Sequence, residues 1–257
     1  MQWKRILFIL FLSLPVLTGL GFWQYTHSAY QARIPGSGTA ELAAELDSRL
    51  PPDRPVAILV PLNGTPTSLD HPSYRNAAVA LEIGMRIPKR DRYLILSEGH
   101  TGDPCVSGAD ITLRLLGLKK GYNQAEAITV LLEEEATTTY ENIIFSKPIL
   151  EERFNKTGVS LLVSGMSAPF GSSLPSLLRG DIGHGARAFM LARSIWHAHS
   201  AIDPVGFIPA NEVDPAIGNY GMRYNFFTMV LASAGVLSLP RFDRNNMRDS
   251  GAVCMVH

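Results

Sequence analysis

Hydrophobic and polar positions follow one another in blocks along this chain, and the blocks predict short strands separated by helices. Several runs are apolar almost throughout, which is typical of strands that are buried on both faces of a sheet. The predicted strands are Val56–Pro61, Tyr93–Ser97, Ala127–Leu132, Val159–Gly165 and, as a last candidate, Ala201–Pro209.

The stretches between these runs carry apolar residues at helical spacing. The predicted helices are Ser73–Met85, Ile111–Leu118, Thr139–Glu152 with a candidate kink at Pro148, and His184–Ile195. Strands of this kind that alternate with helices imply a parallel sheet covered on both faces. The pattern therefore predicts the α/β class, as a Rossmann-like three-layer α/β/α sandwich with a mostly parallel sheet.

The first segment of the chain has a different pattern. Lys4 and Arg5 lead directly into an uncharged apolar run, Ile6–Trp23. As a helix this run would reach roughly 27 Å, close to the thickness of a bilayer core, so it predicts one N-terminal transmembrane helix. Basic residues stay in the cytoplasm, so the rest of the chain is expected outside. The alternative is a signal peptide cleaved near residues 26–28, although signal peptides normally have shorter apolar stretches.

These patterns divide the chain into four regions. Residues 1–25 are the predicted anchor or uncleaved signal, and residues 26–54 are a tether followed by a leading helix, Thr39–Leu50. Residues 55–240 form the α/β domain, and residues 241–257 are a C-terminal tail. The apolar stretch Phe226–Leu239 is short for a second span, so it predicts a buried closing helix.

Composition removes some functions from consideration. Lys plus Arg and Asp plus Glu both number 23, so the net charge is zero and no nucleic-acid partner is expected. The only cysteines, Cys105 and Cys254, lack the spacing of metal ligands, and no metal is predicted. Two free thiols are the simpler interpretation, and one long-range disulfide is the alternative if the domain is exported.

Candidate functional residues are those that follow the predicted strands, because ligands of open parallel sheets bind beyond the carboxyl ends of the strands. Glu141 or Glu98 would serve as general base, and His184 as general acid or base. The candidate ligand-binding residues are Asn63, Gly64, Arg75, Ser97, Gly99, Thr137, Thr139, Asn142, Ser164 and Arg187.

Two of these candidates carry the hypothesis of an anionic ligand. Arg75 and Arg187 lie in predicted first turns of helices, where the helix dipole disfavours a cation by roughly 0.3–1 kcal/mol. A small anion held between them would offset that cost. Structural roles remain open as alternatives. Thr138 and Glu141 also match a capping box, and an arginine can simply reach into water. Arg75 or Arg187 could also pair internally with Glu141 and tie helix starts together.

Four motifs lie on this framework. They are VAILVPLNG followed by Arg75, LILSEG with Ser97 and Gly99, EEATTTYEN from Glu134 to Asn142, and HGARA from His184 to Ala188. In these motifs the chain resembles the domain of unknown function 218 family (YdcF/SanA/ElyC-like proteins) over about Val56 to Phe207. The chain also departs from that pattern. Glu98 replaces a glycine, Gly108 or Ala109 replaces an acidic residue, and the loop between Ser164 and His184 is longer.

The resemblance implies a Rossmann-like domain behind an anchor in the bacterial inner membrane, on the periplasmic side, with a role in envelope and peptidoglycan maintenance. One function consistent with it is an enzyme acting on a phosphorylated or otherwise anionic envelope precursor. Another is a non-catalytic binding or regulatory domain of envelope integrity. A third is a binder of a nucleotide or S-adenosylmethionine-type ligand, which the resemblance associates with a cytosolic branch. No nucleophile elbow, phosphate loop or metal motif selects a reaction, and the cofactor stays unknown.

Overall fold

The computed structural model describes most of the predicted domain. The described residues are 24, 27, 28, 31–88, 90–100, 105–121, 128–166, 183–196 and 201–218. The predicted anchor at residues 6–23, the apolar stretch Phe226–Leu239 and the tail at 241–257 lie outside them. Within the described part of the chain, no helix is long and apolar enough to cross a membrane.

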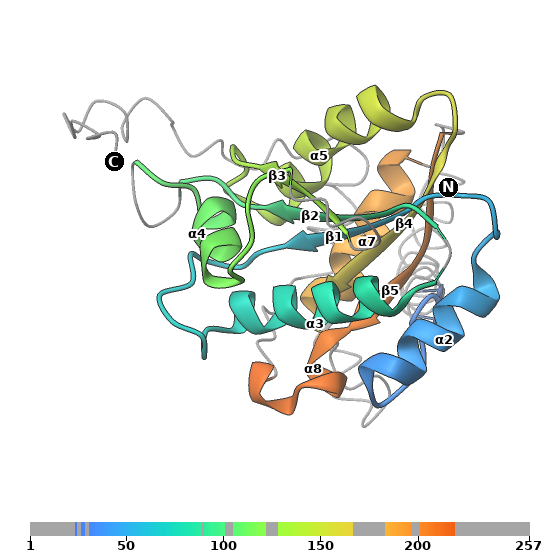
Figure 1. Cartoon of the computed structure of the whole chain (residues 1–257), viewed down its shortest axis with the longest axis horizontal. Coiled ribbons are helices and arrows are strands. Elements are labelled where there is room, and N and C mark those ends of the chain that lie inside the picture. Colours follow the sequence, from blue (N-terminus) through green and yellow to red (C-terminus); the bar gives the residue numbers. More distant parts are fainter. Residues whose placement is uncertain are drawn as a thin grey trace, which may run out of the picture.

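A five-stranded parallel sheet forms the centre of the domain, with the strand order β3-β2-β1-β4-β5 (Figure 1). The strands are β1 (Val56–Pro61), β2 (Arg92–Ser97), β3 (Thr129–Glu133), β4 (Val159–Gly165) and β5 (Ile202–Pro209). All five predicted strands are confirmed, β1 and β4 with the predicted bounds. β3 begins and ends slightly later than predicted, and that shift changes the candidate site described below.

Helices cover both faces of this sheet (Figure 1). One layer holds α2 (Thr39–Arg49), α3 (Pro72–Arg86), α4 (Gly108–Leu115), α8 (Ala210–Val213) and the 3-10 turn η1 (Pro215–Ile217), and the other holds α5 (Thr139–Phe154) and α7 (His184–Trp196). Alternate residues of β1 face the two layers: Ile58 packs in the first core cluster and Leu59 in the second. The predicted three-layer sandwich is therefore confirmed.

Two helix ends show how local sequence fixes these elements. Helix α4 begins before the predicted Ile111, because the Ser107 hydroxyl accepts the Asp110 N–H at 3.0 Å and caps the helix. Residues 108–110 hold little apolar surface, so hydrophobic spacing did not reveal this first turn. At the carboxyl end of α3, the side chain of Arg92 donates to the carbonyls of Met85 and Ile87, at 2.9 and 3.0 Å.

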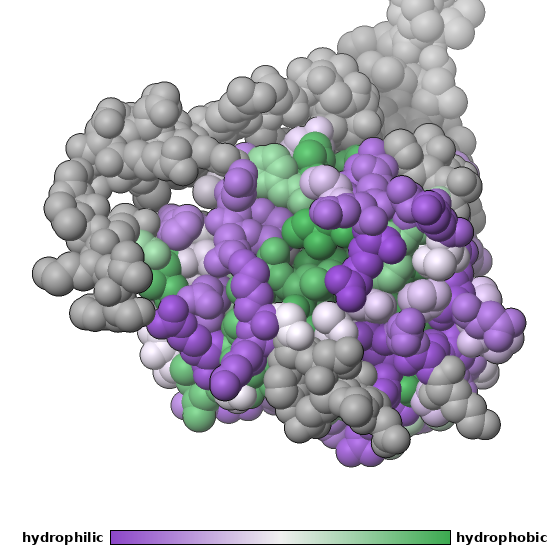
Figure 2. All heavy atoms as spheres, turned by 45° about the horizontal axis from the view of Figure 1, so that its top comes forward, coloured by the Kyte–Doolittle hydropathy of each residue, from purple (hydrophilic) through white to green (hydrophobic). Residues whose placement is uncertain are grey.

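Helix α5 is apolar on more than one side. Its inner face buries Ile143 and Leu150 in the core, while Tyr140, Ile144 and Ile149 on other sides are half-buried. Pro148 lies inside the continuous helix on an exposed position. Figure 2 brings this side of the domain forward and shows an apolar area framed by hydrophilic side chains.

The predicted tether is part of the fold rather than a plain linker. Arg33 forms a parallel bridge with Phe207 of β5. Phe207 donates its N–H to the Ala32 carbonyl at 3.0 Å, and its carbonyl accepts the Ile34 N–H at 3.0 Å. The side chain of Ile34 is buried in the core. Residues 32–34 therefore pair with the outer edge of β5 at Phe207.

Candidate functional site

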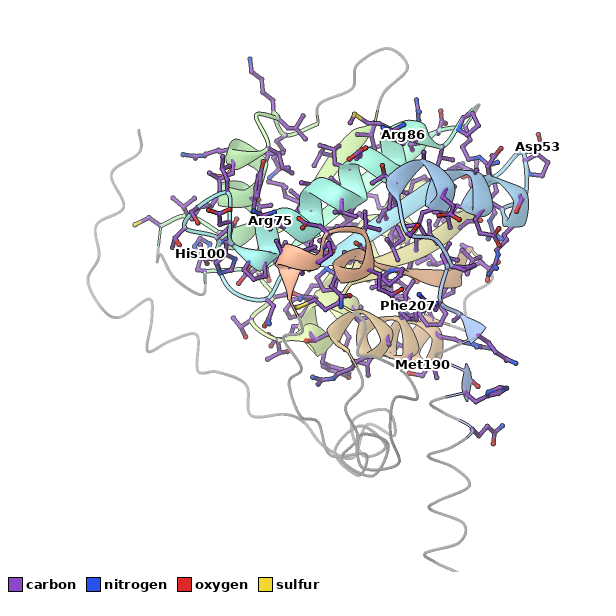
Figure 3. All side chains as sticks on the ribbon, turned by 90° about the horizontal axis from the view of Figure 1, so that it is seen from below. Asp53, Arg75, Arg86, His100, Met190 and Phe207 are labelled. Atoms are coloured by element: carbon purple, nitrogen blue, oxygen red, sulfur yellow. The ribbon has the colours of Figure 1, made fainter. Side chains whose placement is uncertain are left out.

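The parallel sheet brings the candidate residues of its strands to one edge. The register pairs Pro61 with Ser97 and Ser97 with Glu133, so β1, β2 and β3 end side by side. The strand order reverses between β1 and β4, which is the position where open α/β sheets form a ligand crevice. Figure 3 shows Arg75 and His100 at this end of the molecule and Asp53 at the other.

A serine organises the loop between β1 and α3. The Ser73 hydroxyl accepts the Asn63 N–H at 3.1 Å and donates to the Gly64 carbonyl at 2.9 Å. The Ser73 N–H in turn donates to Nδ1 of His71, at 3.2 Å. Gly64 has a φ of 90°, a conformation that favours glycine. Predicted candidates Asn63 and Gly64 are thus held in place by their backbone groups.

We call the edge of the sheet at the carboxyl ends of its strands, with the loops that follow them, the rim. His71, the N-cap of α3, lies on this rim, and the sequence did not single it out. Burial lowers the pKa of its imidazole, which favours the neutral ring. A neutral ring is also what the cap requires, because only an unprotonated Nδ1 can accept the Ser73 N–H. Its proton then lies on Nε2. The available signal was a polar residue followed by proline, a common start of a helix.

Ser164 joins the two sides of the strand-order reversal. Its hydroxyl donates to Oδ1 of Asn76 at 2.7 Å, and Nδ2 of Asn76 donates to the Ser164 carbonyl at 3.4 Å. Both side chains are buried, so this pair ties α3 to the end of β4. A Cβ built at Gly185 would lie 2.8 Å from the backbone of Gly165, which shows how closely α7 begins against the same strand end.

The two candidate arginines occupy the first turns that the sequence predicted, but on helices that cover opposite faces of the sheet. Arg75 donates to Asp214 at 2.9 Å and to Asp70 at 2.6 Å. Asp214 and then Asp70 raise the pKa of its guanidinium, and these carboxylates offset the helix dipole. Arg187 is only 5% exposed. The internal pairing considered for Arg75 therefore occurs, with these aspartates instead of Glu141 as partners.

Ser97, Asn142 and an unpredicted carboxylate, Glu133, form a buried polar cluster. The Ser97 hydroxyl lies 2.5 Å from Oε2 of Glu133 and 3.2 Å from Oδ1 of Asn142. Oε1 of Glu133 accepts the N–H groups of Glu135 and Ala136, at 2.7 and 3.0 Å. Burial raises the pKa of Glu133 even though these three donors lower it. Sequence analysis missed Glu133 because the apolar run of β3 stops one residue earlier.

Glu141 fills the capping role that the sequence left open. Thr138 is the N-cap of α5, and its hydroxyl accepts the Glu141 N–H at 3.2 Å. The Glu141 carboxylate accepts the N–H and hydroxyl of Thr137, at 2.8 and 2.6 Å. In the expected capping box the carboxylate would return to Thr138, so the cap is shifted by one residue. Thr139, also a candidate, is the first residue of the helix.

Glu98 is buried at the end of β2, where the resemblance expects a glycine. A Cβ built at Gly108 would lie 2.5 Å from Oε2 of Glu98. The Gly108 N–H donates to the Gly99 carbonyl at 2.9 Å, and the Ala109 N–H donates to the Glu98 carbonyl at 3.2 Å. The carboxyl group of Glu98 thus occupies the space that a side chain at the start of α4 would need.

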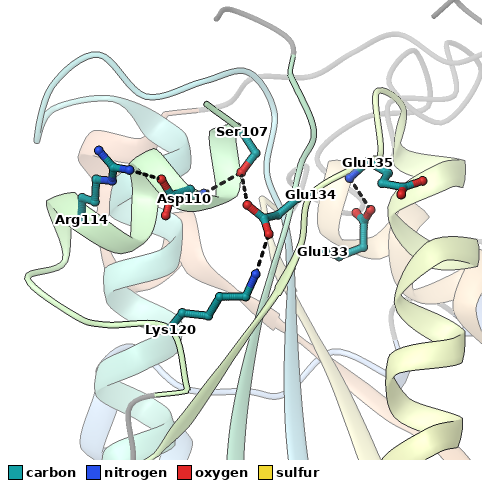
Figure 4. A network of polar contacts seen from close by, with 7 residues as sticks. All are labelled: Ser107, Asp110, Arg114, Lys120, Glu133, Glu134 and Glu135. Carbon is teal, nitrogen blue, oxygen red and sulfur yellow. Dashed lines mark hydrogen bonds and ion pairs between the residues drawn. The ribbon is translucent and has the colours of Figure 1, made fainter. Parts of the chain in front are cut away.

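A second acidic residue, Glu134, is neutralised beside this helix (Figure 4). It accepts the Ser107 hydroxyl at 3.0 Å and the Lys120 ammonium at 2.7 Å. Burial opposes ionisation of Glu134, but Lys120 and Ser107 outweigh it, and the pKa of the carboxyl is lowered. Asp110 and Arg114 form a further ion pair on the same helix at 2.7 Å. Across the described ranges, no group of three or more histidines, cysteines or acidic residues could hold a metal.

Three observations complete the account of the predicted residues. Gly99 is buried and its N–H donates to the Ala136 carbonyl. His184 begins α7, but its side chain lies outside the described part. Cys105 is disulfide-bonded, which agrees with the alternative of a disulfide rather than with free thiols. The chain's other cysteine, Cys254, lies outside the described residues.

Comparison of the chain with protein-family models, with curated proteins and with solved structures finds no match. The resemblance to the domain of unknown function 218 family therefore stays a prediction from the quoted motifs. The α/β class and the parallel sheet rest on the structure itself.

Proposed function

We propose that this chain is a membrane-anchored domain on the periplasmic side that binds a small anionic or phosphorylated ligand in envelope maintenance. The ligand would lie in the crevice between the carboxyl ends of β1 and β4. The observation that carries the proposal is the strand order, which reverses at this position. Gly64 follows β1, Ser164 lies at the end of β4, and the first turn of α7 with buried Arg187 comes after β4.

The state of the rim charges favours binding over catalysis. Arg75 is paired with Asp70 and Asp214, and Glu134 with Lys120. Glu141 is occupied by the cap of α5. Charges that neutralise one another leave few groups to transfer protons. Among the described carboxylates of the rim, Glu133 has a raised pKa, and it supports the enzyme as the second candidate.

Two further features support an exported domain related to the suggested family. Disulfides persist in oxidising compartments such as the periplasm, and Cys105 is disulfide-bonded. The Glu98 carboxyl group occupies the space beside Gly108, where the family pattern has an acidic residue. The two departures from the pattern therefore compensate each other, since the carboxylate moves from the helix start to the strand end.

Ligand binding is tested with the full chain purified in detergent. Native mass spectrometry would detect a retained ligand, and calorimetry with inorganic phosphate and with pyrophosphate would measure affinity directly. Arg187→Gln should weaken binding at least tenfold, whereas Arg75→Gln should retain binding and lower the melting temperature. Equal loss in both variants, or no binding to the wild type, would contradict an anion site at α7.

Membrane topology needs a separate test. A reporter that is active only outside the cytoplasm, fused after His257, should be active in cells. Replacing Lys4 and Arg5 by glutamine should reduce that activity, because these residues set the orientation. Activity of a reporter that works only in the cytoplasm would reverse the proposed side.

A further inference from the structure

The segment before α2 attaches to the domain at one defined place. Residues Ala32 and Ile34 each form a backbone hydrogen bond with Phe207, at 3.0 Å, on the outer edge of β5. The side chain of Arg33 adds an ion pair with Glu212 of α8, with 2.9 Å between Nε and Oε1. Polar bonds to two elements and the burial of Ile34 therefore hold this segment against the domain.

β5 is built to receive the segment. A Cβ at Gly206 would lie 2.7 Å from the Ala32 carbonyl oxygen and 2.8 Å from Cδ1 of Ile34. Only glycine permits this approach of two backbones. The attachment therefore depends on Gly206 of the strand as well as on the residues of the segment.

The chain just before this attachment point is helical where it is described. Gln24, His27, Ser28 and Gln31 all have helical conformation. The Ala32 N–H donates to the Ser28 carbonyl at 3.1 Å, an α-helical bond that ends at the attachment. The proposed anchor ends at residue 23 and the helical conformation ends at Gln31. At 1.5 Å per residue, a helix over these eight residues would span only about 12 Å between the bilayer surface and the attachment. Figure 3 shows the described part of this segment leaving the domain beside Phe207.

We infer that the domain stands on the lipid bilayer with the outer edge of β5 toward the membrane surface and the β3 edge away from it. The inference rests on the proposed anchor at residues 6–23. β5 and β3 are the two outer strands of the sheet. With about 4.8 Å between neighbouring strands, they are roughly 19 Å apart. The crevice between β1 and β4 then opens sideways, parallel to the bilayer, instead of facing the lipid.

Energy transfer to the membrane measures this orientation. The full chain, with its native cysteines replaced by serine, would be reconstituted in vesicles of phosphatidylethanolamine and phosphatidylglycerol that carry a lipid-linked acceptor. A donor dye would be attached at Asp203→Cys on β5 or at Lys119→Cys, both exposed positions. Lys119 precedes Gly121, whose N–H bonds to Val130 of β3 at 3.2 Å. Transfer should be at least twofold more efficient from position 203 than from position 119.

A length control separates the attachment from the anchor. Ten glycine and serine residues inserted after Ser28 remove the helical bond from Ala32 to Ser28. They leave the bonds of Ala32–Ile34 to Phe207 and Glu212 in place but lengthen the chain between bilayer and domain. The difference between the two dyes should then disappear while the protein stays in the vesicles. Equal transfer from both positions in the uninserted protein would overturn the orientation alone. Failure of the protein to float with the vesicles would overturn the anchor, and the orientation with it.

Discussion

Ser97 and Glu133 are direct neighbours in the pairing of β2 with β3, and the Ser97 hydroxyl donates to the Glu133 carboxylate across 2.5 Å. Both side chains are buried. A carboxyl group is therefore kept out of water at the end of an otherwise apolar strand. Because burial raises its pKa, the native state retains a proton at pH values where the unfolded chain has released it.

Glu133 should make the protein less stable as the pH rises from the ordinary carboxyl pKa to the raised one. Over that interval the native state binds more protons than the unfolded state, so the free energy of unfolding falls with increasing pH. Glu133→Gln should flatten this dependence. Its amide oxygen can accept the two N–H groups, and its NH₂ can donate to Ser97, which then donates to Asn142 at 3.2 Å.

Denaturant unfolding of Glu133→Gln and Glu133→Ala at several pH values tests this account. The alanine variant leaves the N–H groups of Glu135 and Ala136 without their acceptor. The free energy of unfolding should fall by about 1–3 kcal/mol for each of these groups that stays buried. A wild-type protein that gains stability with pH over the same interval, relative to the glutamine variant, would contradict the assignment.

The effects of substitutions at Glu98 and Gly108 on stability should be coupled. Gly108→Asp alone places a side chain against the buried Glu98 carboxylate and should destabilise the fold by about 1–3 kcal/mol, since a packed site resists added atoms. Combining it with Glu98→Gly should recover much of that loss, which a double-mutant cycle measures. Gly38→Asp is the control, because a Cβ there meets nothing within 4 Å and aspartate suits the N-cap of α2. Additive effects of the two changes would argue against compensation.

Gly185 should tolerate a methyl group less well than Gly84, although both lie in helices. A Cβ at Gly185 meets the backbone of Gly165, which cannot move aside, so Gly185→Ala should cost about 1–3 kcal/mol. At Gly84 the nearest atom is the Cδ1 tip of Ile128, 2.6 Å away. That tip can rotate, and alanine gains about 1 kcal/mol of helix propensity, so Gly84→Ala should be nearly neutral. Thermal unfolding of both variants decides, and a reversed order would refute the packing argument.

The Glu141 carboxylate should be replaceable by an amide. Glu141→Gln keeps an oxygen that can accept the Thr137 N–H and should preserve most stability. Glu141→Ala should lose about 0.5–2 kcal/mol, as in other cap deletions. Cellular function separates the roles: if glutamine restores both stability and function, the charge is unnecessary. Loss of function in a stable glutamine variant would instead support Glu141 as a general base.

Hydrophobic patterning predicted the layered fold because the strands are largely apolar and the stretches between them carry apolar residues at helical spacing. It could not predict contacts between distant polar residues. Asp214, a partner of Arg75, lies 139 residues further along the chain, in a segment without a clear pattern. Glu133 was missed because its strand continues one residue beyond the apolar run. The attachment of Ala32–Ile34 was missed because so short a segment has no strand periodicity.

The attachment of residues 32–34 to β5 should also hinder pairing between copies of this chain. The outer edge of a sheet carries unpaired N–H and carbonyl groups that can template pairing with another chain. Here residues 32–34 occupy both backbone groups of Phe207. A fragment trimmed to start after Leu50 would keep the whole sheet but leave this edge open. We expect such a fragment to aggregate through β5. The apolar N-terminal run would not be the cause of this aggregation, because the fragment lacks it.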